Sequence, residues 1–266
     1  MEYIVIKCGG SAFQKLPECF YKTIVNIQQT GKWKPIIVHG GGPLINELLC
    51  RLQIETTFVQ GLRVTTDKVL EVVEMVLSGQ VNKEMVQKLT KAGGKTLGLS
   101  GIDGQLLLTK RMANESLGLV GEVVNVNTKL IKSILDLQMI PVISPIGIDC
   151  DGQKYNINGD MAAAAIARAF QAKLCFVSDV PGIYTEENGE LNIYNNLSIN
   201  EIEQLIKDEI ITGGMIPKVQ SAIDCLNHGV KEVVILSGLE TNALLRHLTG
   251  EKIGSSIINN YEVQHV

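Results

Sequence analysis

Short apolar runs that stop at glycine residues alternate along this chain with longer stretches whose apolar residues recur at helical spacing. The first run, Tyr-Ile-Val-Ile at residues 3–6, is followed by Lys7 and by the loop Gly9-Gly10-Ser11, which predicts a buried strand ending at a glycine loop. Helical spacing predicts a helix over residues 17–29. A second strand, over residues 35–38, runs into His39-Gly-Gly-Gly-Pro43, and the proline predicts the start of a helix. The order strand, glycine loop, helix therefore occurs twice.

The same alternation continues through the rest of the chain. Spacing and capping residues predict helices over residues 43–52, 67–77, 82–92, 128–137, 161–170, 198–208 and 215–228, with Leu44, Leu48 and Leu52 on one face of the first and Thr66, Thr128 and Ser198 as caps. Apolar and β-branched runs predict strands over residues 96–99, 106–110, 119–126, 140–143, 173–177 and 233–236, and turn residues predict hairpins over residues 57–64 and near residues 151–152. This order indicates an α/β fold whose largely parallel, open sheet carries helices on both faces. A chain of 266 residues suits two lobes, and we expect their boundary between residues 148 and 179.

Composition narrows the class of protein. The net charge is −4 and lysine and arginine form no run, so the sequence carries no electrostatic signature of nucleic-acid or anionic-membrane binding. The six cysteines are scattered without a C-x-x-C pair, which predicts neither a zinc site nor a disulfide framework. The start of the chain lacks the pattern of a signal peptide, and the longest apolar run, residues 161–167, is too short to span a bilayer. We therefore expect a cytoplasmic protein with reduced thiols.

The candidate chemistry is the binding of an anion. Lys7 follows a strand, and ligands of open α/β sheets bind beyond the carboxyl ends of strands, where glycine loops expose N–H groups. Two glycine loops, two lysines, an arginine on a hairpin and an Asn-x-Asn-x-Asp segment before a helix together favour phosphoryl chemistry. Structural roles remain open for three of these residues: Lys7 as a strand-end lysine, Asp160 as a helix cap and Asn158 as a turn residue. No histidine or cysteine is placed as a nucleophile, and an acceptor carboxylate, already ionised near pH 7, needs no general base.

Two other phosphate or ester sites are disfavoured by spacing. The segment Gly94-Lys95-Thr96 resembles the end of a P-loop, but the first glycine of that motif is replaced by Leu89, so we expect Lys95 to face solvent. An α/β-hydrolase would need a G-x-S-x-G elbow, which the chain lacks.

Six motifs in order resemble the N-acetylglutamate kinase family of the amino acid kinase superfamily. They are Ile6-Lys-Cys-Gly-Gly10, Val38-His-Gly-Gly-Gly-Pro43, Gly61-Leu-Arg-Val-Thr65, Asn156-Ile-Asn-Gly-Asp160, Ser178-Asp-Val-Pro-Gly-Ile183 and Gly213-Gly-Met-Ile-Pro-Lys218. No single motif is diagnostic, but their order is specific and spans nearly the whole chain. The resemblance implies the amino acid kinase fold, with residues 1–160 as a substrate-binding, dimerising lobe and residues 161–266 as an ATP-binding lobe. It implies that MgATP phosphorylates the γ-carboxylate of N-acetyl-L-glutamate, the second step of arginine biosynthesis.

The resemblance also implies roles for individual residues. Lys7 and Lys218 would neutralise the transferring phosphoryl group from opposite sides, and Asp160 would hold both ammonium groups. Backbone N–H groups would bind phosphate oxygens at Gly10, on the nucleotide side, and at Gly41 and Gly42, on the substrate side. Arg63 would bind the α-carboxylate of the substrate and Asn156 its polar backbone. Ser178, Asp179 and Gly182 would lie near ATP, while no protein side chain is predicted to ligate a metal, because Mg²⁺ would arrive with the nucleotide.

Two alternatives and one expectation about assembly complete the interpretation. A kinase for acetylaminoadipate in lysine biosynthesis differs by one methylene group in its substrate, which sequence discriminates weakly. A catalytically silent nucleotide sensor is disfavoured by the presence together of Lys7, Asp160 and Lys218. Arginine-inhibited family members carry an extra N-terminal helix, and because the first strand here starts at Tyr3, we expect a homodimer that is insensitive to arginine.

Overall fold

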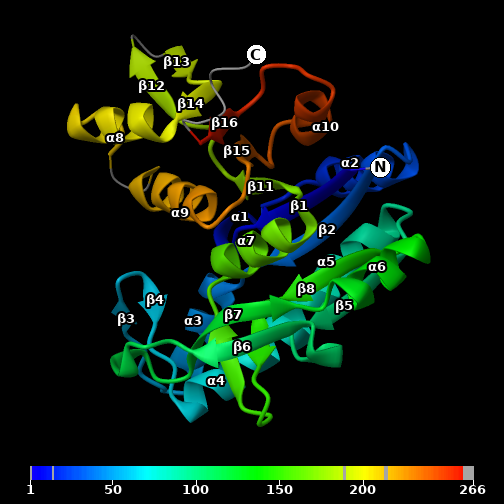
Figure 1. Ribbon diagram of the computed structural model, residues 1–266, viewed down its shortest axis with the longest axis vertical. Helices are drawn as coiled ribbons and strands as arrows, with labels where there is room; N and C mark the ends of the chain where they lie inside the picture. The colour runs from blue at the N-terminus through cyan, green and yellow to red at the C-terminus, as the bar shows by residue number, and fades with distance from the viewer. Residues whose placement is uncertain (1, 14, 188–189, 213–214, 260–266) are drawn as a thin grey trace.

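The computed structural model describes residues 2–13, 15–187, 190–212 and 215–259 of the chain. Its centre is one eight-stranded sheet with helices in front of it and behind it, which confirms the predicted α/β class (Figure 1). From edge to edge the strands are β14 (Asn196–Ser198), β16 (Ser255–Ile258), β15 (Glu232–Ser237), β11 (Lys173–Ser178), β1 (Glu2–Cys8), β2 (Trp33–His39), β8 (Ile140–Ser144) and β5 (Thr96–Ser100). Every neighbouring pair is parallel except β15 and β16.

Alternation along the central strands divides the core into two layers. On β1, Ile4 and Ile6 pack on one face and Val5 on the other, because successive side chains of a strand point to opposite faces. The face of Val5 is covered by α6 (Thr128–Asp136), α7 (Gly159–Phe170), α8 (Ile199–Lys207) and α9 (Ile216–Asn227). The opposite face is covered by α2 (Glu18–Gln29), α3 (Gly42–Arg51), α4 (Asp67–Glu74), α5 (Asn82–Lys91) and α10 (Ala243–Leu248).

Helix α7 lies close to the centre of the sheet because its buried face is built from small side chains. Residues 162–165 are four consecutive alanines, all buried. Fully burying a larger apolar side chain contributes about 1.5–3 kcal/mol, so alanines give up burial energy in exchange for close approach. That approach brings the first turn of α7 to the end of β1, where Lys7 lies.

Smaller elements flank the main sheet. A second sheet closes on itself in the order β10 (Lys154–Ile157), β7 (Val120–Val126), β6 (Leu107–Arg111) and β9 (Ile146–Ile148). Two hairpins are formed by β3 (Phe58–Val59) with β4 (Leu62–Arg63) and by β12 (Tyr184–Glu187) with β13 (Glu190–Ile193). Short helical turns are α1 (Gly10–Phe13) and the 3₁₀ turns Asp103–Gln105 and Glu115–Leu117. The hairpins predicted over residues 57–64 and near residues 151–152 are both present.

Three sequence predictions about helices need correction. The buried face of α3 carries Ile45 and Leu49, whereas Leu52 lies at the C-cap and is 50% exposed. Helix α6 is capped by the side chain of Asn127, which accepts from the N–H of Leu130, so Thr128 is not the cap. The two helices predicted over residues 67–77 and 82–92 are joined, because a π-helical segment, Met75–Val81, connects α4 to α5 without a break.

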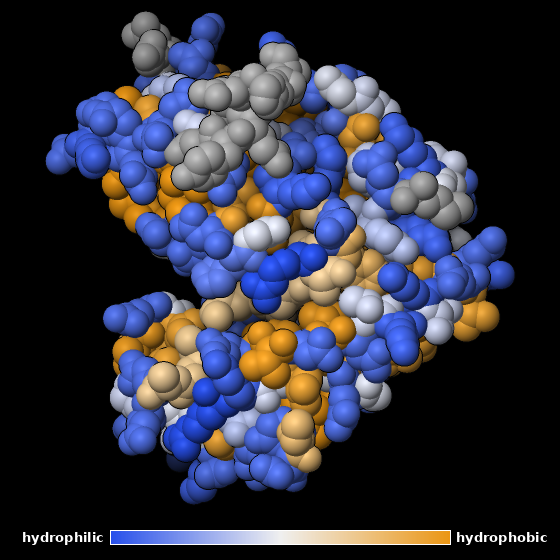
Figure 2. Space-filling view, viewed as in Figure 1, coloured by the Kyte–Doolittle hydropathy of each residue, from blue (hydrophilic) through white to orange (hydrophobic). Residues whose placement is uncertain are grey.

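The molecule is hollowed between two groups of elements. Figure 2 shows a notch at the left margin, at the level where Figure 1 places α9 above and the β3–β4 hairpin below. In the described part of the chain, no helix has both the length and the apolar character needed to cross a membrane. The division into lobes at residue 160 stays a prediction, and the sheet itself continues from β2 through β1 to β11.

Candidate active site

Lys7 and Asp160 form an ion pair at the end of β1. Nζ of Lys7 lies 2.7 Å from Oδ1 of Asp160, which is the second residue of α7. The lysine side chain is only 17% exposed, so it is enclosed between the strand and the helix rather than extended into solvent. Asn158 caps α7, since its side chain accepts from the N–H groups of Asp160 and Met161. The Asp160 carboxylate is therefore not used as a helix cap and is available to Lys7.

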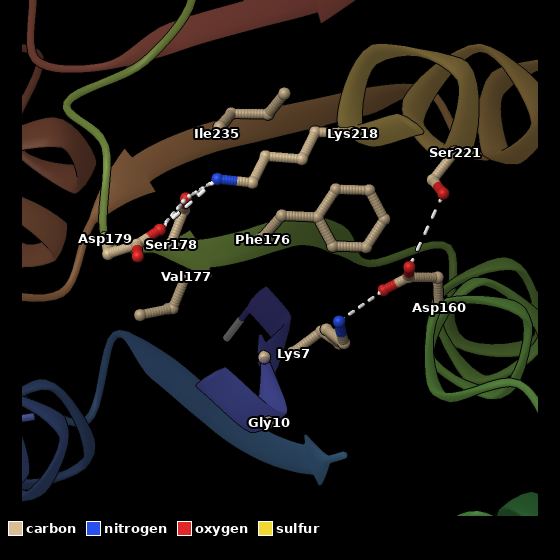
Figure 3. A pocket seen from close by; sticks show the side chains of 11 residues that line it. Lys7, Gly10, Asp160, Phe176, Val177, Ser178, Asp179, Lys218, Ser221 and Ile235 are labelled. Carbon is tan, nitrogen blue, oxygen red and sulfur yellow. Dashed lines mark hydrogen bonds and ion pairs between the residues drawn. The ribbon is translucent and has the colours of Figure 1, made fainter. Parts of the chain in front are cut away.

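Lys218 approaches the same pocket from α9, on the other side. Its Nζ donates to Oγ of Ser178 at 2.6 Å and lies 3.4 Å from Oδ1 of Asp179, just beyond β11 (Figure 3). A hydrogen bond from its own backbone N–H holds the pKa of Asp179 below its ordinary value, and the ammonium groups of Lys218 and Lys15 act in the same direction against burial. Lys15 is 3.8 Å from the other oxygen of Asp179. One carboxylate at the pocket rim is thus held by two cations.

The expectation that Asp160 holds both lysines is met for Lys7 alone. The second carboxylate oxygen of Asp160 accepts from Oγ of Ser221 at 3.4 Å. Ser221 lies one turn after Lys218 on α9, so the shorter side chain faces Asp160 while the longer one reaches to the end of β11 (Figure 3). Two carboxylates, rather than one, position the two ammonium groups.

The two glycine loops touch each other beside these lysines. A Cβ at Gly10 would lie 2.8 Å from the backbone nitrogen of Gly42 and 2.9 Å from that of Gly41, so only glycine fits there without displacement. A Cβ at Gly41 would meet Leu77 at 2.7 Å, whereas Gly42 faces open space. Helix α3 begins at Gly42, and the first N–H groups of a helix have no partner within it. Such N–H groups are suited to binding anionic oxygens.

Arg63 lies at the end of the β3–β4 hairpin and is buried, being 8% exposed. Its guanidinium donates to Oδ1 of Asn46 at 2.6 Å and to Oγ1 of Thr56 at 2.9 Å, and stacks 4.7 Å from the ring centre of Phe58. Burial lowers the pKa of Arg63, and none of the acidic side chains in the described ranges pairs with it. A buried guanidinium held only by neutral partners is well suited to an anionic ligand.

Asn156 is tied to the Arg63 hairpin through Thr65. Nδ2 of Asn156 donates to Oγ1 of Thr65 at 3.0 Å, and that hydroxyl donates to the carbonyl of Arg63 at 2.9 Å. Gly182 lies elsewhere, packed against β16, where a Cβ would meet Oγ of Ser255 at 2.7 Å.

The pocket between the ends of β1 and β11 and the helices α7 and α9 has a volume of about 170 Å³. Its lining includes six of the predicted site residues: Lys7, Gly10, Asp160, Ser178, Asp179 and Lys218. Gly41 and Gly42 adjoin it through Gly10, while Arg63, Asn156 and Gly182 are not part of the lining. Sequence reasoning missed Phe176 and Ser221, both of which line the pocket. Ser221 had a signal, because a residue three positions after Lys218 shares its face of a helix.

The fold and pocket define an α/β protein that gathers ammonium groups and helix-start N–H groups beyond the carboxyl ends of parallel strands, an arrangement suited to phosphate groups. The family model described as "Amino acid kinase family" matches residues 2–237, and the chain belongs to this family.

One curated protein and two solved structures are similar to this chain. The chain is 48% identical over 266 residues to the acetylglutamate kinase of Oceanobacillus iheyensis, covering 100% of each chain. Its structure is similar to that of smu.665 from Streptococcus mutans UA159, with a TM-score of 0.80, 32% identity and coverage of 96% of this chain and 98% of the other. A carbamate kinase from Giardia lamblia, solved with AMP-PNP, shares the fold with a TM-score of 0.68 at 17% identity, covering 97% of this chain and 99% of the other.

Proposed function

We propose that this protein transfers the γ-phosphoryl group of ATP to the γ-carboxylate of N-acetyl-L-glutamate, giving N-acetyl-L-glutamyl 5-phosphate in the second step of arginine biosynthesis. The observation that carries the proposal is the 48% identity, over 100% of both sequences, to the acetylglutamate kinase of Oceanobacillus iheyensis. The pocket supports it, because its cations and N–H groups suit a polyanionic ligand.

The chemical difficulty of this reaction is the repulsion between two anions, which the positive charges of the lysines would reduce. Lys7 and Lys218 approach the pocket from opposite sides and would stabilise the charge on the transferring phosphoryl oxygens. Asp160 orients the first ammonium group, while Ser178 and Asp179 orient the second. The acceptor carboxylate is ionised near pH 7, so the reaction needs no protein group to remove a proton.

The glycine loops and the Arg63 hairpin would divide the binding of the two substrates. The N–H of Gly10 would bind the nucleotide phosphates, and those of Gly41 and Gly42 the transferring group. Arg63 would bind the α-carboxylate of the acylated amino acid as a two-pronged donor, and Asn156 would bind the substrate's amide. Gly182, which packs against Ser255, would support the nucleotide-binding segment after β11 rather than contact ATP directly.

Magnesium would be bound mainly by the nucleotide itself. Within the described ranges, no cluster of three or more histidine, cysteine or acidic side chains could hold a metal ion. The pocket carboxylates, Asp160 and Asp179, are already paired with lysines. This donor set fits an ion that retains water and phosphate ligands, as Mg²⁺ does, and such an ion would neutralise charge on the phosphate oxygens.

Lobes, assembly and compartment belong to the same proposal. Residues 1–160 would bind the acylated amino acid and residues 161–266 the nucleotide, on either side of the notch in Figure 2. We expect a homodimer, which light scattering would measure directly. All six cysteines are free, which is typical of a reducing compartment such as the cytoplasm.

The test is to trap the acyl phosphate with hydroxylamine in the presence of ATP and Mg²⁺, comparing N-acetylglutamate, free glutamate and N-acetylaminoadipate. We expect hydroxamate to form fastest from N-acetylglutamate. Faster reaction of the longer substrate would move the protein to the lysine-pathway activity and leave the lysine roles intact. Absence of hydroxamate with every carboxylate, although ATP binds, would contradict the proposal and favour a nucleotide sensor.

A further inference from the structure

Asn82 is a fully buried polar residue with no part in the proposed site. It lies where the π-helical segment Met75–Val81 passes into α5. Its amide nitrogen lies 2.9 Å from the carbonyl oxygen of Val142 on β8 and 3.2 Å from that of Leu99 on β5. The same nitrogen is 3.2 Å from Nε2 of His39, the last residue of β2. One side chain therefore contacts three neighbouring strands near their carboxyl ends.

The orientation of the Asn82 amide follows from its other neighbour. Nζ of Lys83 lies 3.1 Å from Oδ1 of Asn82, and an ammonium group can only donate, so the amide oxygen faces Lys83 and the nitrogen faces His39. Because the amide nitrogen can only donate, Nε2 of His39 accepts from it, sharing the two hydrogens of this nitrogen with the carbonyl oxygens of Val142 and Leu99. Burial lowers the pKa of His39 to about 4, so the ring is neutral near pH 7. Its single proton then lies on Nδ1.

This proton connects the buried pair to the glycine loop. Nδ1 of His39 lies 3.2 Å from the carbonyl oxygen of Gly40, the first residue of that loop. The N–H of Gly40 donates to the carbonyl of Cys8 at 3.0 Å, and Gly41 rests against Leu77 of the π-helical segment. These three contacts fix the backbone that presents the N–H groups of Gly41 and Gly42. The π-helical segment is part of this arrangement, and π-helical turns recur at functional sites.

We propose that Asn82 is a positioning residue for phosphoryl transfer. It holds His39 in the tautomer protonated on Nδ1, and His39 fixes the Gly40 carbonyl and thereby the N–H groups of Gly41 and Gly42. The inference rests on the proposed function, which places these N–H groups on the transferring phosphoryl group. Groups that orient metal ligands typically change activity by about 10- to 100-fold when removed, and we expect an effect of the same order here.

The first experiment reads the tautomer without any substrate. In protein labelled with ¹⁵N-histidine, a long-range ¹H–¹⁵N spectrum distinguishes a ring protonated on Nδ1 from one protonated on Nε2, and His39→Gln identifies the signal. We expect a neutral ring with the proton on Nδ1 in the wild type. Asn82→Leu, which keeps the branched shape but cannot donate, should shift the proton toward Nε2. A proton on Nε2 in the wild type would overturn the inference at once.

The second experiment measures kcat and KM in a double-mutant cycle. Asn82→Leu and His39→Gln should each lower kcat by about 10- to 100-fold with KM for both substrates within about twofold. The double variant should be no slower than the slower single variant, because both changes release the same loop. Thr23→Val is the matched control: Thr23 is 2% exposed, its hydroxyl contacts Cys19 and Asn242 rather than the glycine loop, and its loss should leave kcat unchanged.

The outcomes separate this inference from the proposed function. Full additivity of the two kcat losses, or a normal kcat after the tautomer has shifted, would overturn the role of Asn82 while the activity stands. A wild type that forms no acyl phosphate would overturn the proposed function and this role together. If Asn82→Leu does not fold, Asn82→Asp replaces it. A carboxylate has the same shape but accepts a hydrogen bond where the amide donates one, so it should move the ring proton to Nε2.

Discussion

At the scale of single residues, the pocket differs from the sequence expectation in how its charges are paired. A single aspartate was expected between two lysines, but Asp160 and Asp179 each hold one. The spacing of residues along the chain gives no information on this, because the pairing depends on how far Lys218 reaches across from α9. What the sequence does predict is that strand ends and glycine loops bring Lys7 and Gly10 together, since the carboxyl ends of parallel strands meet at one edge.

The two lysines should matter for the chemical step more than for folding. We expect Lys7→Ala and Lys218→Ala each to lower kcat by about 10²- to 10³-fold, because each removes one fixed cation from the developing charge. Steady-state kinetics with a circular dichroism melt would measure both effects. Lys95→Ala is the control, since Lys95 is exposed as predicted and far from the pocket lining. Near-normal turnover in either pocket variant would remove that lysine from the mechanism.

Arg63 should act on substrate binding. Arg63→Ala should raise the KM for the acylated amino acid by about 10- to 100-fold, because the substrate loses its hydrogen bonds to a charged group. The KM for ATP should change less. Arg63→Lys should recover only part of this, because an ammonium group cannot form the two-pronged contact. The exposed Arg51, mutated to alanine, serves as control. If both Arg63 variants showed the same KM values as the wild type and the control, Arg63 would not contact the substrate.

At the scale of helices and strands, prediction succeeded where the signal is local. The Ser198 capping box and the hairpin near Gly61 depend on residues within a few positions, and both are present. Prediction failed where tertiary packing decides the outcome. Gly79 favours a break between two helices, but the π-helical segment Met75–Val81 continues through it, because buried side chains of this segment pack against Gly41 of the glycine loop. Strand β16 and helix α10 were missed for the same reason, since both are short and held by their neighbours.

The cap of α7 should affect both stability and activity. Asn158→Ala should destabilise the protein by about 1 kcal/mol, a fall in Tm of roughly 2–4 °C for a chain of this size. It should also lower kcat, because the capped N–H belongs to Asp160, which holds Lys7. Asn127→Ala removes the cap of α6 and should lower Tm similarly without changing kcat. Equal kcat values in the two variants would show that the Asn158 cap does not influence the active site.

At the scale of the whole molecule, the fold class and the largely parallel sheet followed from the alternation of strands and helices. The order of the strands did not follow, because nothing local places β1 between β2 and β11. The second, closed sheet was equally hidden, because its pairing joins β10 to both β7 and β9, and no local pattern in the sequence indicates that pairing. Site residues near one strand end were therefore predictable as a group, whereas the distance of Arg63 from the pocket lining was not.

Acid should destabilise the folded molecule through His39. Its pKa in the folded state is about 4, lowered by burial and by the nearby Lys83, against about 6.5 when unfolded. As pH falls through 6.5 the unfolded state binds the proton first, so the free energy of unfolding falls by up to about 3 kcal/mol and levels off near pH 4. Urea denaturation between pH 7.5 and 4 should show a shallower decline for His39→Gln. Parallel declines would contradict this source of acid sensitivity.

The pairing of β1 with β11 also has a consequence for how the chain folds. Ile6 lies opposite Cys175, so the middle of the sheet joins segments that are synthesised far apart in time. Closing so long a loop costs entropy before any contact compensates it, which makes such pairings slow. Until β11 emerges from the ribosome, β1 has one unpaired edge of Val and Ile residues, and such edges recruit other chains. Cutting the chain at residue 160 should therefore yield an aggregating fragment.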